Sequence, residues 1–150
     1  MPATSLLSRL QHDHPSLHFM HGDGFRWSPT ENTVFYDDAN DFSQLLHETS
    51  HALLHHHTFT RDITLLEMER DAWQKARELA RKYHLKLTDD TVDSALDTYR
   101  DWLEARSTCP VCSMTGVQHT RFEYRCPACL AVWRVNDARV CGLKRYIIKK

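Results

Sequence analysis

The sequence predicts an α+β fold: a small antiparallel β-meander and three helices, followed by a Cys-rich mini-domain. Turn residues separate short aromatic and β-branched runs over residues 17–36, which is the pattern of hairpins. Apolar residues then recur at helical spacing over residues 41–103. All five cysteines follow residue 106, where the charge balance changes from −7 (residues 1–106) to +6 (residues 107–150). We therefore expect two domains, residues 1–106 and residues 107–150.

The first elements are a short helix and three short strands. Leu6, Leu7 and Leu10 share one face of a helix predicted over residues 4–11. Strands are predicted over residues 17–20, 25–27 and 33–36, and the turns between them contain Gly, Pro and Asn. Because the strands follow one another through short turns, we expect an antiparallel meander.

Three longer helices follow the strands. Asp41 can cap the first, with Gln44 completing a capping box, and the helix is predicted to continue to about His56. The second covers residues 65–83, where the apolar side chains fall on one face. Thr88 caps the third, which continues to about Leu103.

Composition narrows the classes of protein. Hydrophobic residues make up 41% of the chain and charged residues 26%, so a packed core is expected rather than disorder. No apolar run approaches the length of a membrane span, and the N-terminus lacks the layout of a secretory signal. We therefore expect a cytoplasmic protein without membrane contact. The 11 His and 5 Cys are high counts for this length and indicate metal binding.

Residues 45–54 contain the pattern H-E-x-x-H. A spacing of four places His47 and His51 one turn apart on one helix face, so both imidazoles can reach one zinc ion. Glu48 lies beside His47 and can accept a proton from a zinc-bound water without being a ligand. The alternative is a surface helix with solvated histidines.

Two histidines leave a catalytic zinc one protein ligand short. The acidic candidates downstream are Asp62, Glu67, Glu69 and Asp71. On the helix over residues 65–83, Glu69 lies about 60° from the centre of the apolar face and Glu67 about 140° from it. A buried carboxylate needs a partner, which zinc supplies, so Glu69 is the predicted third ligand. The alternative is a glutamate that pairs with an arginine at the rim of the apolar face.

These two helices resemble a known family. Residues 47–55, HETSHALLH, match H-E-x-x-H-x-L-L-H, and residues 69–76, ERDAWQKA, match E-x-x-A-x-x-x-A. Over roughly residues 30–85 the chain is thereby similar to the ImmA/IrrE-like metallopeptidases of the gluzincin group. The resemblance implies a soluble intracellular endopeptidase in which His47, His51 and Glu69 bind zinc and Glu48 is the general base. Many members carry Asp or Asn where this chain has Trp73, so the partner of a ligand histidine is expected elsewhere, for instance at Asp71.

The strand before the active-site helix is the candidate for substrate binding. In zincins generally, an edge strand above the cleft binds an extended peptide by β-augmentation. The candidate substrate-binding residues are therefore Thr33, Val34, Phe35 and Tyr36. The alternative is an internal strand that packs on the helix. The group that stabilises the oxyanion is left open among Tyr36, His55 and His57.

The cysteines form a second metal motif. Cys109 and Cys112, followed after thirteen residues by Cys126 and Cys129, give C-x-x-C…C-x-x-C, which predicts a closed structural zinc site. Strands over residues 118–125 and 130–135 complete a zinc ribbon, so we expect two zinc ions per chain. Two disulfides are the alternative, which the missing signal sequence disfavours. Cys141 is left over and is expected to be a small buried hydrophobe.

The ribbon is basic and rich in aromatic residues, which suits contact with nucleic acid or docking to a protein. Its aromatic residues are Phe122, Tyr124, Trp133 and Tyr146; alternatively, they form the core of the ribbon itself. The sequence as a whole predicts a zinc-dependent endopeptidase acting on a specific intracellular protein. One alternative is a DNA-associated protease like SprT, although no third histidine is well placed. The other is a non-catalytic adaptor for nucleic acid or protein, in which Glu48 has no role.

Overall fold

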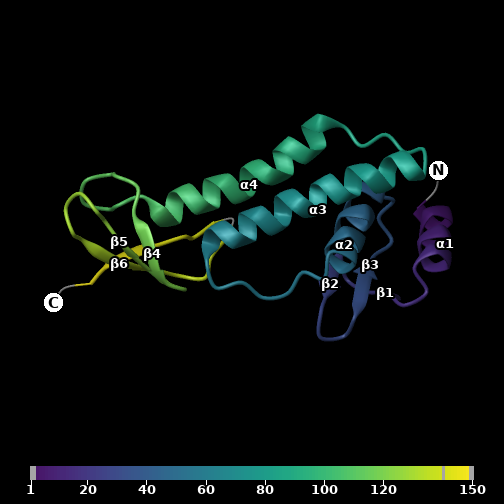
Figure 1. The fold of residues 1–150 in the computed structure, drawn as a ribbon, viewed down its shortest axis with the longest axis horizontal. Helices are drawn as coiled ribbons and strands as arrows, with labels where there is room; N and C mark the ends of the chain where they lie inside the picture. Colours follow the sequence, from purple (N-terminus) through teal and green to yellow (C-terminus); the bar gives the residue numbers. More distant parts are fainter. Residues whose placement is uncertain (1–2, 140, 149–150) are drawn as a thin grey trace. The chain divides into compact units, whose positions relative to one another are not determined.

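The computed structural model describes residues 3–139 and 141–148, and the chain divides into two compact units. Unit 1 comprises residues 1–58 and 68–92, and unit 2 comprises residues 59–67 and 93–150. The described residues form four helices and two small sheets, which confirms the α+β class (Figure 1). The predicted boundary at Arg106 falls within unit 2. Among the described helices, none is both long and apolar enough to span a bilayer.

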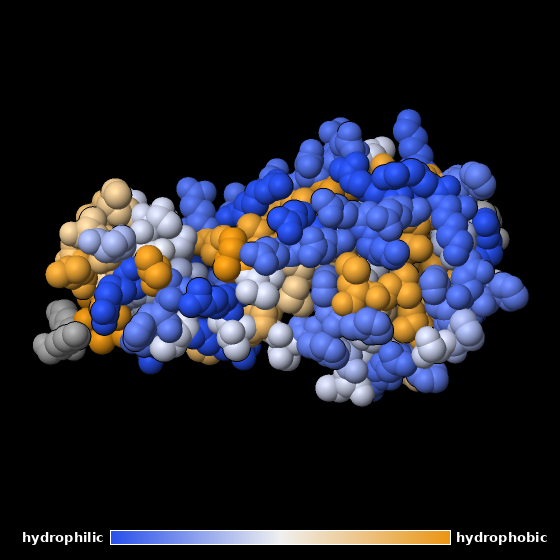
Figure 2. All heavy atoms as spheres, in the orientation of Figure 1, coloured by the Kyte–Doolittle hydropathy of each residue, from blue (hydrophilic) through white to orange (hydrophobic). Residues whose placement is uncertain are grey.

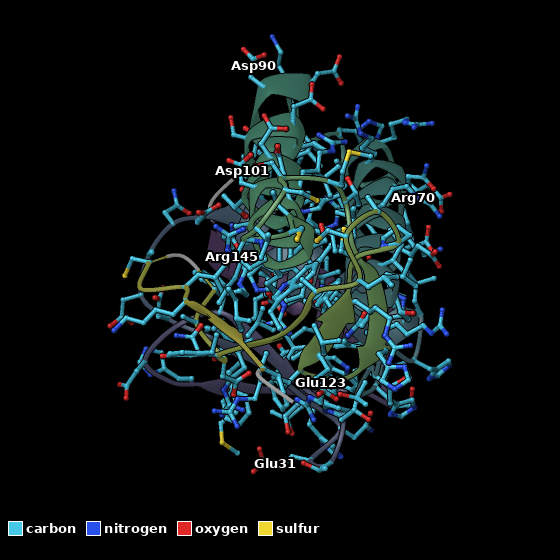
Figure 3. All side chains as sticks on the ribbon, turned by 90° about the vertical axis from the view of Figure 1, so that its left-hand side faces the viewer. Glu31, Arg70, Asp90, Asp101, Glu123 and Arg145 are labelled. Atoms are coloured by element: carbon cyan, nitrogen blue, oxygen red, sulfur yellow. The ribbon has the colours of Figure 1, made fainter. Side chains whose placement is uncertain are left out.

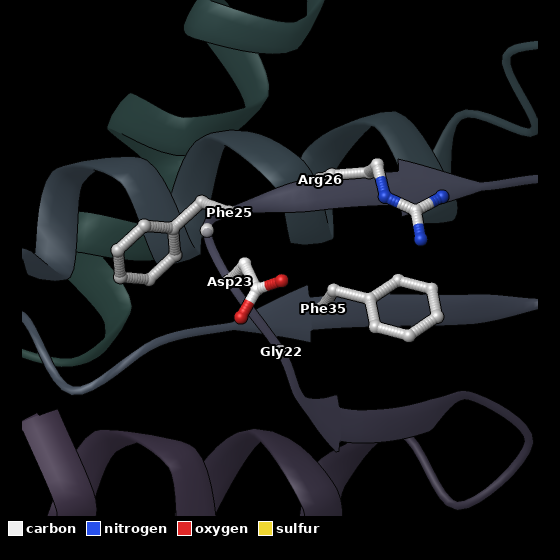
Figure 4. A pocket seen from close by; sticks show the side chains of 6 residues that line it. Gly22, Asp23, Phe25, Arg26 and Phe35 are labelled. Atoms are coloured by element: carbon white, nitrogen blue, oxygen red, sulfur yellow. The ribbon is translucent and has the colours of Figure 1, made fainter.

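Unit 1 contains a three-stranded sheet. The strands are β1 (His18–His21), β2 (Arg26–Ser28) and β3 (Thr33–Tyr36). The order is β1-β3-β2, with β3 parallel to β1 and antiparallel to β2, so the prediction of an antiparallel meander is wrong. After β1 the chain crosses the end of β3 and forms β2 on the far side (Figure 4). Gly22 permits this close crossing, because a Cβ atom there would lie 3.3 Å from the Phe35 ring.

The central position of β3 contradicts the expectation that Thr33–Tyr36 form an edge strand. Both edges of β3 are paired, so these residues have no free edge at which a peptide could add by β-augmentation. Val34 is fully buried on the sheet side that packs against α2 (Phe42–Leu53). β3 is therefore the internal strand of the alternative interpretation, and β2 is the edge strand beside α2.

Helix α2 begins at the predicted cap and ends in a Schellman motif. Asp41 Oδ1 accepts hydrogen bonds from Gln44 N at 3.2 Å and from the Ser43 hydroxyl at 2.6 Å. At the other end, His55 adopts a left-handed conformation with φ of 56°. His56 N then donates to the carbonyl of His51 at 3.0 Å, and His55 N donates to Ala52 at 3.1 Å. This left-handed turn ends the helix before His56, which was its predicted end.

Two further helices supply the rest of the unit 1 core. α1 (Ala3–Asp13) buries Leu6 and Leu10 completely, and α3 (Asp62–Lys82) buries most of its predicted apolar face. Of that face Ala72, Ala76 and Leu79 are buried and Leu65 is half-buried, and α3 also buries Trp73 and Ala80. Charged side chains on the opposite side of α3, such as Arg70, point into solvent, as do Asp90 and Asp101 of α4 (Asp89–Ser107) (Figure 3). Thr88 caps α4 as predicted, by accepting a hydrogen bond from Thr91 N at 3.2 Å.

Unit 2 contains a four-stranded antiparallel sheet in chain order. Its strands are β4 (Val117–Thr120), β5 (Glu123–Arg125), β6 (Val132–Val135) and β7 (Arg145–Ile147). The single strand predicted over residues 118–125 is in fact β4 and β5, because the chain turns at Arg121 and Phe122. Tyr124 and Trp133 stack in the core of this sheet with ring centroids 5.8 Å apart. These two aromatic residues therefore belong to the core of the unit 2 sheet.

A buried ion pair joins the start of α3 to the end of α4 within unit 2. Asp62 and Arg106 are 1% and 2% exposed. Arg106 donates to the Asp62 carboxylate from Nε at 2.6 Å and from Nη2 at 3.3 Å, and the Tyr124 hydroxyl donates to it at 2.5 Å. Burial and this hydrogen bond to Asp62 raise the pKa of Tyr124. Asp62, an acidic candidate for zinc, is thus engaged by Arg106.

Candidate metal centres

His47, His51 and Glu69 form a buried cluster in unit 1, called here the His-His-Glu group. The histidines lie on successive turns of α2, and Glu69 comes from α3. The Glu69 carboxylate lies 2.9 Å from His47 Nε2 and 3.1 Å from His51 Nε2, and the two Nε2 atoms are 3.1 Å apart. Glu67 is exposed. The structure therefore brings together the three residues that the sequence predicts as ligands.

The donor atoms of this group are arranged to fit a metal ion. Zinc–ligand bonds of about 2.0–2.1 Å in a tetrahedron place the donor atoms about 3.3 Å apart, close to the separations found here. Glu69 Oε2 is buried and forms no hydrogen bond with the described residues, although His47 Nε2 is nearby. Burial raises the pKa of Glu69, but the neighbouring imidazoles outweigh it and lower that pKa to about 2. The carboxylate is therefore ionised, as a metal ligand must be.

Glu48 lies next to the His-His-Glu group without belonging to it. Its Oε2 atom accepts a hydrogen bond from the backbone N–H of Trp27, in edge strand β2, at 2.9 Å. Burial raises the pKa of Glu48, and the opposing effect of His47 and His51 does not cancel it. A carboxylate with a raised pKa is a stronger base than an ordinary glutamate, and this one is held at a fixed position.

The side chains that orient the two histidines differ from those expected. His51 Nδ1 lies 2.8 Å from His56 Nδ1, and burial lowers the pKa of His56, which favours its neutral ring. His47 stacks on Trp73 with ring centroids 4.1 Å apart, and its Nδ1 atom has no hydrogen-bond partner among the described residues. Asp71, the expected partner, instead accepts a hydrogen bond from Arg70 at 3.2 Å. In the sequence, Trp73 was the one signal of this arrangement, because it stands where a carboxylate or amide partner for a ligand histidine was expected.

The four predicted cysteines converge in unit 2 and are called here the four-cysteine group. The Sγ atoms of Cys109 and Cys129 are 3.6 Å apart, those of Cys112 and Cys126 are 3.5 Å apart, and all four are free thiols. Bonds of about 2.3 Å to a tetrahedral zinc place sulfur atoms about 3.8 Å apart. The backbone N–H of Cys129 lowers the pKa of Cys126 to about 7, which favours the thiolate that binds metal.

The remaining cysteine and the cavity beside the sheet lie outside both groups. Cys141 is exposed, so the prediction that it is buried is wrong.

A cavity of about 440 Å³ lies on the sheet face that carries Arg26 and Phe35, where the Arg26 guanidinium is 4.1 Å from the Phe35 ring centroid (Figure 4). None of its lining residues belongs to the His-His-Glu group.

The two groups differ in how many metal positions the protein fills. Around a tetrahedral ion, the three side chains of the His-His-Glu group would leave one position for water or substrate, whereas the four cysteines would leave none. The first arrangement is typical of catalytic sites and the second of structural sites. No protein-family model, curated protein or solved structure matches the chain, so the functional assignment depends on the geometry of these two groups.

Proposed function

We propose that the protein is a zinc-dependent endopeptidase whose catalytic zinc is held by His47, His51 and Glu69. The observation that carries this proposal is the position of Glu48, a half-buried carboxylate of raised pKa beside the ligand group but outside it. A metal site with a purely structural role has no use for such a base. A second zinc ion, held by the four-cysteine group, stabilises unit 2.

The residues of the chain have separate roles in the proposed reaction. Zinc, when bound, polarises the scissile carbonyl and lowers the pKa of water. Glu48 takes a proton from the attacking water and passes it to the leaving amine. The Trp27 N–H holds the Glu48 carboxylate in place before the substrate arrives, because it already donates to Oε2 at 2.9 Å.

An extended peptide is the substrate that suits this site. β2 is an edge strand, and its Trp27 N–H is directed to Glu48 rather than to β3. A peptide that lies along the outer edge of β2, where Glu48 already occupies the Trp27 N–H, is therefore next to the base and the ligand group. We infer that β2 has the role that the sequence assigned to Thr33–Tyr36.

The proposal is tested by incubating the zinc-loaded protein with a mixture of unfolded cellular proteins. We expect new N-termini, detected by mass spectrometry, that disappear with a chelator and return when zinc is added. His47→Ala should produce none of them, because it removes a ligand. The proteome is the appropriate substrate, because a protease of narrow specificity can ignore generic peptides. Identical N-termini with and without zinc would contradict the proposal.

A second proposed function, binding of single-stranded nucleic acid, is favoured by the exposed face of the ribbon sheet. Arg125, Arg134 and Tyr146 lie on the face opposite the buried Tyr124 and Trp133, and the Arg134 guanidinium is 5.9 Å from the Tyr146 ring centroid. Cations neutralise phosphates and aromatic rings stack on bases. Hydrophobic residues also reach the surface of the molecule (Figure 2). In unit 2 the exposed ones include Val117, Leu130 and Ile147.

Salt-dependent binding of a single-stranded oligonucleotide tests this second function. We expect affinity to fall several-fold for Arg134→Gln, and to fall steeply between about 50 mM and about 200 mM salt. Arg100→Gln is the matched control, because Arg100 pairs with Asp97 on helix α4 and lies outside the sheet. Fluorescence anisotropy measures both effects. An absence of binding at low salt would leave the ribbon as a structural unit.

A further inference from the structure

The turn that ends helix α2 places a third histidine against a metal ligand. In the Schellman motif, His51 occupies the third position from the helix end and His56 the second position after the cap. These two positions usually make an apolar contact in this motif. Here they carry two imidazoles whose Nδ1 atoms are 2.8 Å apart. The backbone geometry of the turn therefore determines which side chain faces His51.

The contact between the two rings has a defined direction. His51 directs Nε2 toward Glu69 and His47, so Nε2 is the metal-binding nitrogen and must be free of a proton. The proton of the neutral ring then lies on Nδ1, which donates to His56 Nδ1. His56 thus acts as the acceptor that ligand histidines generally require on their second nitrogen.

His56 is itself held in place from two directions. Its backbone N–H donates to His51 at 3.0 Å, and its carbonyl accepts a hydrogen bond from the Trp27 indole at 2.9 Å. Trp27 is also the residue whose backbone N–H holds Glu48. The other ligand histidine, His47, has no such acceptor among the described residues and is oriented by its stacking on Trp73.

We propose that His56 is a positioning residue for the metal centre: it accepts the Nδ1 proton of His51 and fixes that ring, while Trp27 fixes His56. The proposal rests on the proposed metal-binding role of the His-His-Glu group. Acceptors of this kind contribute about 10- to 100-fold to metal affinity. The hydrogen bond makes His51 the more firmly oriented of the two ligand histidines.

The test compares His56→Phe with His56→Asn in the full chain, with zinc kept in the four-cysteine group and Co²⁺ added to the other. His56→Phe keeps a ring but removes the acceptor, so we expect Co²⁺ affinity to fall about 10- to 100-fold and the visible absorption bands of the bound ion to change. His56→Asn places a carbonyl oxygen near the former Nδ1 position and should restore both. His55→Gly is the matched control, since it removes an exposed neighbouring imidazole and suits the left-handed turn.

A second variant keeps the test decisive if His56→Phe does not fold. Trp27→Phe removes the indole donor to His56 and retains the backbone N–H, so we expect a smaller loss of Co²⁺ affinity with the same spectral change. The proposal is overturned if His56→Phe binds Co²⁺ like the wild type, or if His56→Asn is as weak as His56→Phe. Wild-type protein that binds no metal through these residues overturns the proposed function as well. Metal binding that follows this pattern without peptide cleavage supports His56 and contradicts only the peptidase.

Discussion

Glu48→Gln is expected to lower peptide hydrolysis by about 10²- to 10⁴-fold, the usual contribution of a general base. The substitution keeps the size of the side chain and leaves His47, His51 and Glu69 intact. An amide oxygen can still accept the hydrogen bond from the Trp27 N–H, so the position of the side chain should be preserved. The measurement is the rate of cleavage at a site found with the wild type, together with the zinc content of both proteins.

Glu78→Gln is the control for this substitution. Glu78 is an exposed carboxylate on α3 that pairs with Lys75, so its loss should change neither the cleavage rate nor the zinc content. Two results would contradict the assigned role of Glu48. A Glu48→Gln protein that cleaves at the wild-type rate would show that another group is the base, and one that has lost a zinc ion would show that Glu48 is a ligand.

Asp62→Asn is expected to destabilise unit 2 by about 3–5 kcal/mol, because it leaves the buried guanidinium of Arg106 without a counter-charge. In the wild type, Arg106 and Tyr124 both donate hydrogen bonds to the Asp62 carboxylate. An asparagine side chain would place an NH₂ group, itself a donor, against one of these donors. Urea denaturation followed by circular dichroism and tryptophan fluorescence measures the effect, since the Trp133 indole is fully buried and donates to the Arg106 carbonyl.

Asp97→Asn is the control for this substitution, because it removes the same charge from an exposed ion pair instead of a buried one. Asp97 pairs with Arg100 on the exposed side of α4, and surface pairs contribute less than about 1 kcal/mol. A joint replacement, Asp62→Leu with Arg106→Met, should recover much of the lost stability, because it removes both charges from the interior. Equal effects of Asp62→Asn and Asp97→Asn would contradict the assignment of Asp62 as a buried anchor.

The two candidate metal-binding groups were predictable because short-range spacing encodes them. The spacing of four positions from His47 to His51 fixes one helix face, and two C-x-x-C pairs fix two knuckles whatever the rest of the fold does. Glu69 was predictable from the phase of the apolar residues on its helix, which places it on the side that the structure buries. In each case the information lies within one element or one motif.

The features that the sequence did not predict depend on long-range contacts or on unusual backbone conformations. Turn residues show where the chain reverses after β1, but not that it crosses β3 before pairing again. The turn that brings His56 to His51 has His55 in a left-handed conformation, a position where Gly is the common residue. Because the sequence has no Gly there, it gives no signal of the turn. Asp62 and Arg106 are 44 positions apart, and no local pattern links them.

That separation along the chain also determines when unit 2 can form during synthesis. Asp62 leaves the ribosome 44 residues before Arg106 and 62 residues before Tyr124, so its carboxylate is at first surrounded by water. Contacts between such distant positions form late, because a long stretch of chain must be closed first. A nascent chain that ends at Arg106 has both charges but no sheet to cover them, and an exposed pair contributes only about 0–1 kcal/mol. Folding of the unit 2 sheet is therefore the step at which the weak Asp62–Arg106 surface pair becomes buried. We expect unit 2 of the nascent chain to resist proteolysis only after Cys126 and Cys129 have emerged from the ribosome.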